Sequence, residues 1–356
     1  MHKNKRPTIK DIARESGFSH ATVSRVLNKK GRFYSEKTSK EIEKIAKRLN
    51  YTPNAIARYL KNRKTKVIAY LIPESHSFYF SIYNGVREVA EKYGYNILIM
   101  SSEYDMKREN LNIKTLLENR VVGVIIASTM INERQITLLR DSGLPIVLVD
   151  REENYKNISN VVINNEEISF LGTSHLIELG HEKIAYISGP LDILNYKKRF
   201  LGYRRALKEN KIEFDNSLVF IMKSLKWLTT YGRDYRMIKN IIIDNKEITA
   251  LFIISETLPI VAIKIARDSC LRIPQDLAIL GFNELPISKY IVPPISSIVL
   301  PTKEMGCKAM NILLKMMEDS QYKEFLELKS ELMVRESTIA ARKSKKSEKF
   351  IDIQDK

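Results

Sequence analysis

From residue 67 onward, short apolar runs alternate with longer amphipathic stretches. The runs rich in Val, Ile and Leu are predicted strands at 67–72, 96–100, 122–127, 146–150, 161–163, 184–188, 250–254 and 277–281. Helix-length stretches lie around 78–93, 107–119, 132–142, 166–180, 197–210, 231–244, 257–269 and 303–318. Continuous apolar runs separated by helices are typical of buried parallel strands in βα units. The pattern predicts an α/β body over residues 66–339.

This body is too long to form a single sheet of ordinary size with its helices. The chain has 356 residues, and domains of about 100 to 200 residues allow two or three in that length. Open α/β sheets bind ligands beyond the carboxyl ends of their strands. We therefore expect two lobes with parallel sheets and a ligand cleft between them.

Residues 1–50 have a different pattern, which predicts a helix-turn-helix headpiece. Thr8 is suited to cap a first helix, Gly17 supplies the turn, and Ser19 can cap a second helix. The inward apolar positions of the two helices are Ile9, Ile12, Ala13, Val23, Val26 and Leu27. The outward face of the second helix is short, polar and basic, as a helix that enters the DNA major groove requires. Its members are His20, Ala21, Thr22, Ser24 and Arg25.

The positive charge of the chain is concentrated at this end. The net charge is +17, and residues 1–66 hold 19 Lys and Arg against 5 Asp and Glu. Residues 67–339 hold 34 of each sign and are neutral. A basic block that coincides with a helix-turn-helix favours phosphate binding over the alternative of a solvated lysine-rich arm.

Several other classes of protein are disfavoured. We find no dinucleotide, P-loop or nucleophile-elbow motif, and the five histidines do not cluster, so no enzyme, cofactor or metal site is expected. His175 and His181 are interpreted as surface or packing residues. No apolar run approaches the roughly 18 to 20 residues that span a bilayer, and no signal region follows the N-terminus. Cys270 and Cys307 are interpreted as reduced core thiols, a regulatory disulfide being the alternative, and a cytoplasmic location is expected.

Several segments resemble the lactose-repressor/galactose-repressor (LacI/GalR) family of bacterial transcription regulators. They are T-I-K-D-I-A-R at 8–14, A-T-V-S-R-V-L-N at 21–28, Y-T-P-N-A-I-A-R-Y-L at 51–60, L-I-E-L-G-H-E-K-I-A-Y-I-S-G-P at 176–190, R-F-L-G-Y-R-R-A-L at 199–207 and V-R-E-S-T at 334–338. The N-terminal motifs are highly specific and those of the body are looser. The resemblance implies a homodimer that binds double-stranded DNA at a pseudo-palindromic operator. It also implies a body like the periplasmic sugar-binding proteins, which senses a small molecule.

The expected base contacts come from the second helix. Arg25 is the best candidate for a bidentate contact with guanine, and His20 and Ala21 resemble the pair that specifies sequence in the family. Because Ala21 offers only a methyl group, His20 is expected to discriminate more. The residues expected to fix register on the DNA backbone are Thr8, Thr22, Ser24 and Asn28.

Residues 51–65 are predicted to be a hinge helix and linker. The segment 54–60 is too short to be a stable helix alone, so it should fold only with DNA and a partner copy. In the family such helices pair in the minor groove, where Leu60 matches the residue that wedges between base steps. Ala57 is small enough for close approach, and Asn54 is the third expected minor-groove residue. The alternative is that Leu60 packs on the headpiece core.

The effector site is expected at the ends of the strands. Asp150 and Arg199 resemble family residues that hydrogen-bond polar ligands, and a carboxylate with a guanidinium suits sugar hydroxyls. Arg151 lies beside Asp150, and the run Phe78, Tyr79 and Phe80 looks like an aromatic wall. The alternatives are surface ion pairs for the charged residues and core packing for the aromatic ones.

Two departures from the family pattern fall in this predicted site. Ser255-Glu256 stands where the family usually has Asn-Asp, and Asn283 followed by Glu284 stands where it usually has an aspartate. We include Glu256 and Asn283 in the effector site and expect its chemistry to differ from that of familiar members. The effector could be a sugar, a sugar phosphate or a nucleobase-like compound, or a protein partner could replace it.

The functional prediction is a repressor of carbohydrate-utilisation genes that a small-molecule effector switches. A transport receptor or carbohydrate enzyme on the same body, and a sequence-blind nucleoid protein, are the alternatives. Residues 340–356 form a basic tail that is expected to be disordered. Because that tail lacks a leucine heptad, a dimer is preferred over a tetramer, and no membrane partner is expected.

Overall fold

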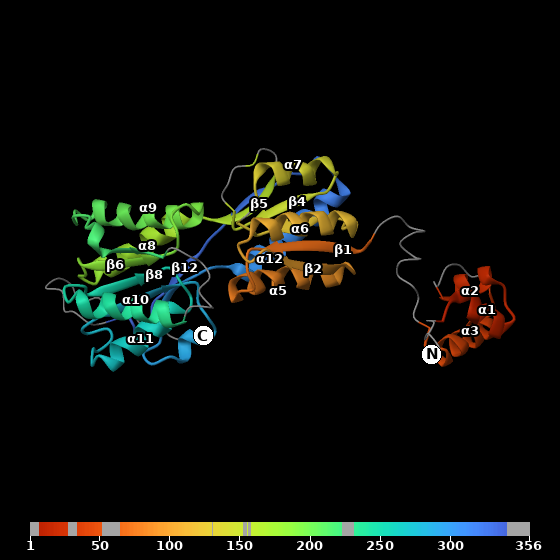
Figure 1. The fold of residues 1–356 in the computed structure, drawn as a ribbon, viewed down its shortest axis with the longest axis horizontal. Coiled ribbons are helices and arrows are strands. Elements are labelled where there is room, and N and C mark those ends of the chain that lie inside the picture. Colours follow the sequence, from red (N-terminus) through yellow and green to blue (C-terminus); the bar gives the residue numbers. More distant parts are fainter. Residues whose placement is uncertain are drawn as a thin grey trace. The chain divides into compact units, whose positions relative to one another are not determined.

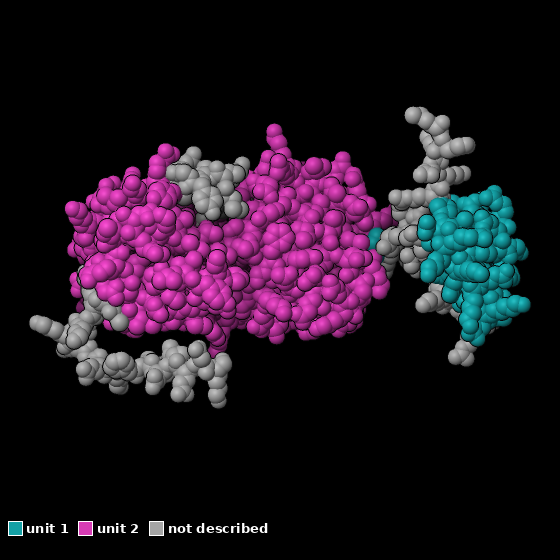
Figure 2. All heavy atoms as spheres, turned by 90° about the horizontal axis from the view of Figure 1, so that it is seen from below, with its two compact units in different colours: residues 1–65 teal, residues 66–356 magenta. Residues whose placement is uncertain are grey.

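The computed structural model describes residues 7–27, 34–51, 65–129, 131–151, 155, 158–222 and 231–339. The chain divides into two compact units, residues 1–65 and 66–356, which Figure 1 and Figure 2 show by sequence colour and by unit. The expected hinge residues Asn54, Ala57 and Leu60, the backbone candidate Asn28 and the tail 340–356 lie outside the described residues.

Within its described residues the first unit contains three helices, α1 Ile9–Ser16, α2 His20–Leu27 and α3 Glu36–Arg48. They enclose a small core, whose buried members are Ile12, Val23, Val26, Ile42 and Ala46. Both the turn and the caps predicted from the sequence are present. Thr8 donates from its backbone N–H and its hydroxyl to the Asp11 carboxylate, at 2.8 and 2.7 Å. Gly17 ends α1 in the left-handed region with φ 70°, which glycine adopts without steric cost.

Ser19 caps α2, because its Oγ accepts a hydrogen bond from the backbone N–H of Thr22 at 3.1 Å. Loss of such a cap costs about 0.5 to 2 kcal/mol. We expect Ser19→Ala to speed hydrogen exchange of the α2 amides by about two- to thirtyfold in the full chain. Ser19→Asp keeps an acceptor and is expected to exchange like the wild type. Equal acceleration in both variants would show that the hydroxyl is not the cap.

The second unit is built from two lobes, each with a six-stranded sheet. The first sheet has the order β11-β5-β4-β3-β1-β2, and all of its neighbouring strands are parallel. Its strands are β1 Val67–Ile72, β2 Asn96–Ser101, β3 Val124–Ile126, β4 Ile146–Val149, β5 Ser159–Ile163 and β11 Phe325–Leu328. Its helices are α5 Ser77–Lys92, α6 Met106–Glu118, α7 Glu133–Asp141 and α12 Thr302–Glu318.

The second sheet has the order β12-β10-β9-β8-β6-β7 and is parallel except where β12 meets β10. Its strands are β6 Ile184–Ser188, β7 Val219–Ile221, β8 Ala250–Ile253, β9 Ala278–Phe282, β10 Ser296–Val299 and β12 Glu331–Met333. Its helices are α8 Asn165–Glu178, α9 Leu194–Glu209, α10 Tyr231–Asp244 and α11 Leu258–Asp268, with the short helices η1 Asn216–Leu218 and η3 Ser288–Tyr290. The fold is therefore the α/β class with a helix-turn-helix headpiece that the sequence predicts.

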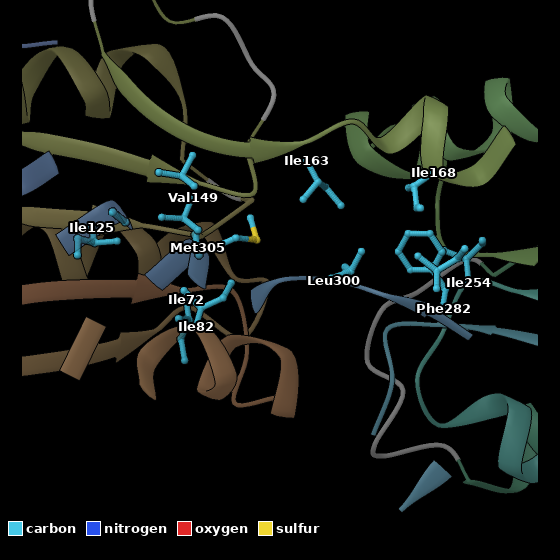
Figure 3. Packing of buried hydrophobic residues seen from close by; sticks show 14 of the residues in the cluster. Ile72, Ile82, Ile125, Val149, Ile163, Ile168, Ile254, Phe282, Leu300 and Met305 are labelled. Atoms are coloured by element: carbon cyan, nitrogen blue, oxygen red, sulfur yellow. The ribbon is translucent and has the colours of Figure 1, made fainter. Parts of the chain in front are cut away.

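The described chain passes from one lobe to the other three times, after β5, after β10 and after β11. One buried apolar cluster spans both lobes along these connections. Figure 3 shows Ile163 and Leu300 between the group around Ile72 and Val149 and the group around Phe282. The two lobes thus share apolar packing along the connections between them.

Helix pairs in both lobes pack closely through glycine. An added Cβ at Gly306 of α12 would lie 2.0 Å from the carbonyl oxygen of Ile82 on α5. At Gly202 of α9 it would lie 2.1 Å from the carbonyl oxygen of Glu166 on α8. These positions admit no side chain without movement of the backbone.

The cysteines correct one expectation. Both are free thiols, but Cys270 is exposed and is not a core residue, whereas Cys307 is partly buried and packs against the apolar cluster that spans the lobes. Cys270 directly follows the turn that ends α11, with φ 57°, and this position turns its side chain to the surface. Among the helices in the described ranges, none is long and apolar enough to cross a membrane.

Candidate functional site

The N-terminal half of α2 presents the side chains predicted to read DNA. His20, Ala21 and Arg25 are exposed, whereas Thr22 is partly buried beside the cap. The Thr22 hydroxyl lies 2.9 Å from Ser19 Oγ. Ser24 is partly buried, and Thr8, at the start of α1, is exposed. Since Val23 and Val26 anchor the opposite face of α2 in the core, the rigid headpiece fixes the direction of the exposed face.

A cavity of about 90 Å³ lies between the two lobes of the second unit. All six predicted effector residues line it: Phe78, Tyr79, Asp150, Arg199, Glu256 and Asn283. The other lining residues are Glu74, His76, Tyr104, Thr129, Ile193, Asn195, Tyr196, Ile254, Ser255, Phe282 and Leu300. Most of the lining residues follow the carboxyl ends of β1, β2, β3, β4, β6, β8, β9 and β10, where an open parallel sheet gathers polar loops.

Glu256 is the centre of a polar cluster that joins the lobes. Its Oε1 lies 2.7 Å from Nδ1 of His76 and also accepts a hydrogen bond from the Ser77 hydroxyl. Its Oε2 accepts a hydrogen bond from Nδ2 of Asn283 at 2.6 Å. His76 and Ser77 follow β1 in the first lobe, whereas Glu256 and Asn283 follow β8 and β9 in the second. The contact therefore spans the cleft.

The electrostatics of this cluster favour a protonated imidazole. Burial lowers the pKa of His76, but the hydrogen bond and charge of Glu256, with the charge of Glu74, outweigh burial and raise that pKa. Burial raises the pKa of Glu74, and the charge of His76 and a hydrogen bond from Tyr104 only partly offset it. The charges of two carboxylates in the cleft thus act on one imidazole.

The His76 contact makes a pH-dependent contribution to the stability of the second unit. Because folding raises the pKa of His76, its contribution is complete below the unfolded value of about 6.5 and is lost as pH rises through the folded value. We expect the wild type to exceed His76→Gln in melting temperature by more at about pH 6 than at about pH 9. His181→Gln is the control for a histidine distant from the cleft. A difference that stays constant with pH would contradict the contact.

Arg199 also lines the cavity and is held there by contacts within the second lobe. Its Nε donates a hydrogen bond to Oδ1 of Asn165 at 2.6 Å, and its guanidinium lies 4.2 Å from the centroid of the Phe282 ring. Nδ2 of Asn195 donates to the backbone carbonyl of Asp150 at 2.9 Å. Asp150 adopts φ 55°, in the left-handed region, immediately after β4. These contacts link the first turns of α8 and α9 to the edge of the first sheet.

Three residues considered from the sequence do not line the cavity. Phe80 is 41% exposed on α5, because it lies one position past the pair that faces the cleft. Arg151 is buried beside the cavity and is absent from its lining. Glu284, the second departure residue, instead pairs with Arg335, its carboxylate 2.8 Å from the guanidinium.

The sequence reasoning missed several lining residues that follow strands directly. Glu74 and His76 come just after β1, and Tyr104 comes after β2. Their position after a predicted apolar run was a usable signal. Tyr196 and Phe282 carried no such signal, since one lies within the first turn of a helix and the other ends a strand.

The comparisons with known proteins agree with this geometry. Residues 8–54 match the bacterial regulatory proteins of the lacI family, residues 68–233 a periplasmic binding protein domain, and residues 173–338 a periplasmic binding protein-like domain. The HTH-type transcriptional repressor PurR of Aliivibrio fischeri (strain MJ11) is 32% identical over 335 residues, which cover 93% of this chain and 98% of PurR.

Two solved structures have the same fold. A transcriptional regulator CelR–cellobiose complex has a TM-score of 0.69 at 27% identity and covers 93% of this chain and 100% of that one. The Lac repressor dimer bound to operator and the anti-inducer ONPF has a TM-score of 0.79 at 23% identity. The match covers 94% of this chain and 100% of that one. The chain belongs to the lacI family of bacterial regulatory proteins. It is a DNA-binding transcription regulator rather than an enzyme, as the sequence analysis expected.

Proposed function

We propose that this protein represses genes of carbohydrate use by occupying a pseudo-palindromic operator as a homodimer. The observation that supports this most is the exposed basic face of α2, with His20, Ala21 and Arg25 standing on a rigid core. A helix of this kind reads base edges in the major groove, and a two-fold dimer presents two of them to two half-sites. The Lac repressor, whose fold the chain shares, is a dimer on operator DNA in its solved structure.

The hinge completes the proposed DNA contact. Asn54, Ala57 and Leu60 would pair with their copies in the minor groove, where Leu60 would wedge between the central base steps. Thr8, Thr22, Ser24 and Asn28 would hold the backbone and fix the register. This arrangement makes bending of the operator centre part of recognition, and it implies action in the cytoplasm, where the DNA is.

The cleft is the proposed switch. A small polar ligand, of which a sugar is the favoured type, would bind among Phe78, Tyr79, Asp150, Arg199, Glu256 and Asn283 and change the angle between the lobes. Aromatic faces beside fixed polar groups support this proposal, and one fold neighbour was solved with cellobiose. A coupling of about 1 to 3 kcal/mol would change operator affinity about 5- to 150-fold.

A footprint of the full chain on the DNA upstream of its own gene tests the proposal. The experiment is run at near-physiological salt, because non-specific binding by counterion release weakens there. Protection of a pseudo-palindrome with a distorted centre is the expected result. Uniform protection of every sequence would contradict it, and Leu60→Ala is expected to reduce the distortion without moving the protected site.

A further inference from the structure

We infer that the cleft between the lobes takes a polyhydroxylated ligand that is uncharged or carries an amine, and that it discriminates against phosphorylated and carboxylated ligands. In this arrangement Glu74 accepts a hydrogen bond from a ligand hydroxyl or ammonium group. The inference rests on the proposed function, because it assumes that the cleft is the effector site.

The charge of the lining is the first argument. Among the described residues that line the cavity, three carry carboxylates, Glu74, Asp150 and Glu256, and two carry basic groups, His76 and Arg199. The excess is negative whether the imidazole is protonated or neutral. A like charge brought into a site with little water is disfavoured, so an anionic ligand starts at a disadvantage here.

The helix ends that could hold an anion are the second argument. His76 is the N-cap of α5 and Ser77 is its first residue, and both already contact the Glu256 carboxylate. At the start of α11 the Oγ of Ser255 accepts hydrogen bonds from the backbone N–H groups of Thr257 and Leu258, at 3.3 and 3.2 Å. Phosphate groups commonly bind to such N–H groups. At α11 a side chain of this protein occupies two such N–H groups. At α5 the Glu256 carboxylate already lies against the side chains of the first two positions.

The single guanidinium is the third argument. Nε of Arg199 is engaged by Asn165 and its plane lies over the Phe282 ring. This leaves the terminal amino groups of the guanidinium to donate hydrogen bonds to ligand oxygens, and it is the one guanidinium in a described lining that holds three carboxylates. The first turn of α9 beside Arg199 is the remaining place for an anion, and a phosphate seated there is the outcome that would overturn the inference.

Glu74 is the group that the ligand would engage. Among the described residues, the one hydrogen bond that reaches its carboxylate comes from the Tyr104 hydroxyl, at 3.0 Å from Oε1. A carboxylate has about four acceptor positions, so a half-buried one with a single donor retains capacity for hydroxyl or ammonium donors. Burial raises the pKa of Glu74, because the cleft solvates its charge only partly. Phe78, Tyr104, Tyr196 and Phe282 supply the apolar faces that the C–H surface of a sugar ring needs.

Isothermal titration of the full chain with matched pairs tests the inference. The probes are glucose and glucose 6-phosphate, glucosamine and glucosamine 6-phosphate, and cellobiose and cellobionate. We expect at least one neutral or amine-bearing member to bind, and its anionic partner to bind at least about tenfold more weakly. Tighter binding of any anionic member overturns the inference, and so does the failure of every neutral and amine-bearing probe at millimolar concentration.

Glu74→Gln identifies the responsible carboxylate. We expect this variant to bind the probe about tenfold or more weakly than the wild type, because hydrogen bonds to a charged group are worth about 1.5 to 3 kcal/mol. The loss should be larger, and more dependent on salt, for an amine than for a neutral sugar. Glu103→Gln, which removes a nearby carboxylate outside the lining, is the control and is expected to bind like the wild type.

Equal losses of affinity in the two variants would mean that the total charge near the cleft, rather than contact with Glu74, determines how tightly the probe binds. A melting curve of each unliganded variant confirms that it is folded. The titration is carried out without DNA and measures ligand binding alone. A failure of the cleft inference can therefore be distinguished from a failure of the operator footprint.

Discussion

Replacing Arg25 by alanine is expected to weaken binding to the operator by about ten- to a hundredfold and to relax discrimination at one base pair of each half-site. Arg25 is exposed on α2, whose buried face is fixed by Val23 and Val26. A bidentate pair between a guanidinium and guanine is worth about 1 to 3 kcal/mol against the wrong base. Binding is measured by fluorescence anisotropy on the footprinted operator, on single-base variants of it and on an unrelated duplex at about 0.15 M salt.

Arg25→Lys is the matched control for charge. It keeps the cation but lacks the fork of donors that guanine requires, so we expect it to behave like Arg25→Ala on the operator and like the wild type on unrelated DNA. If Arg25→Ala instead weakened all duplexes equally, with Arg25→Lys unaffected, the residue would be a phosphate contact. The slope of affinity against salt would then fall by about one charge.

Gly306→Ala is expected to lower the free energy of unfolding of the second unit by about 3 kcal/mol. Its Cβ would lie 2.0 Å from the carbonyl oxygen of Ile82 and 2.8 Å from the backbone nitrogen of Val86. Both obstacles are backbone atoms within α5, so relief requires the two helices to separate. Urea unfolding followed by circular dichroism measures the loss.

A gain in the free energy of unfolding of Gly306→Ala, or no change, would contradict this packing. In an exposed helix, Gly→Ala stabilises by about 1 kcal/mol, so a neutral or stabilising result would mean that α5 and α12 do not approach this closely. Asn311→Ala, on the exposed face of the same helix, is the control for helix propensity and is expected to change stability only slightly. Gly202→Ala repeats the test between α8 and α9, where the expected loss is similar.

The strands that the sequence predicted are buried on both faces, except for β2, which lies at an edge of the first sheet and is only partly buried. The expected range 67–72 coincides with β1, and 184–188 coincides with β6, because uninterrupted Val, Ile and Leu runs have few other uses. The missed strands are β7, β10, β11 and β12. β7 is three residues long, β10 begins with Ser296 and Ser297, and β11 and β12 alternate exposed with partly buried positions. β7, β11 and β12 lie at sheet edges and form when a neighbouring strand is present, so their local sequence does not specify them. β10 lies inside the second sheet, but its two serines break the apolar pattern.

The site was predictable where a polar residue follows an apolar run. Asp150 and Glu256 were found in this way and line one cavity, although their strands lie in different lobes. The sequence could not predict which side chains these residues contact in the folded protein. The contact of His76 with Glu256 depends on two lobes meeting, and no spacing along the chain encodes it. The placement of Arg199 over Phe282 has the same origin.

The passage of the chain between the lobes determines the order in which the protein can be completed during synthesis. The first sheet needs β11, and its helix layer needs α12, yet both come after nearly all of the second lobe. Until residues 325–328 have left the ribosome, the edge of β5 is open to pairing with another chain. The headpiece emerges first and closes its own core early. A nascent chain therefore carries a folded headpiece before it carries two complete lobes.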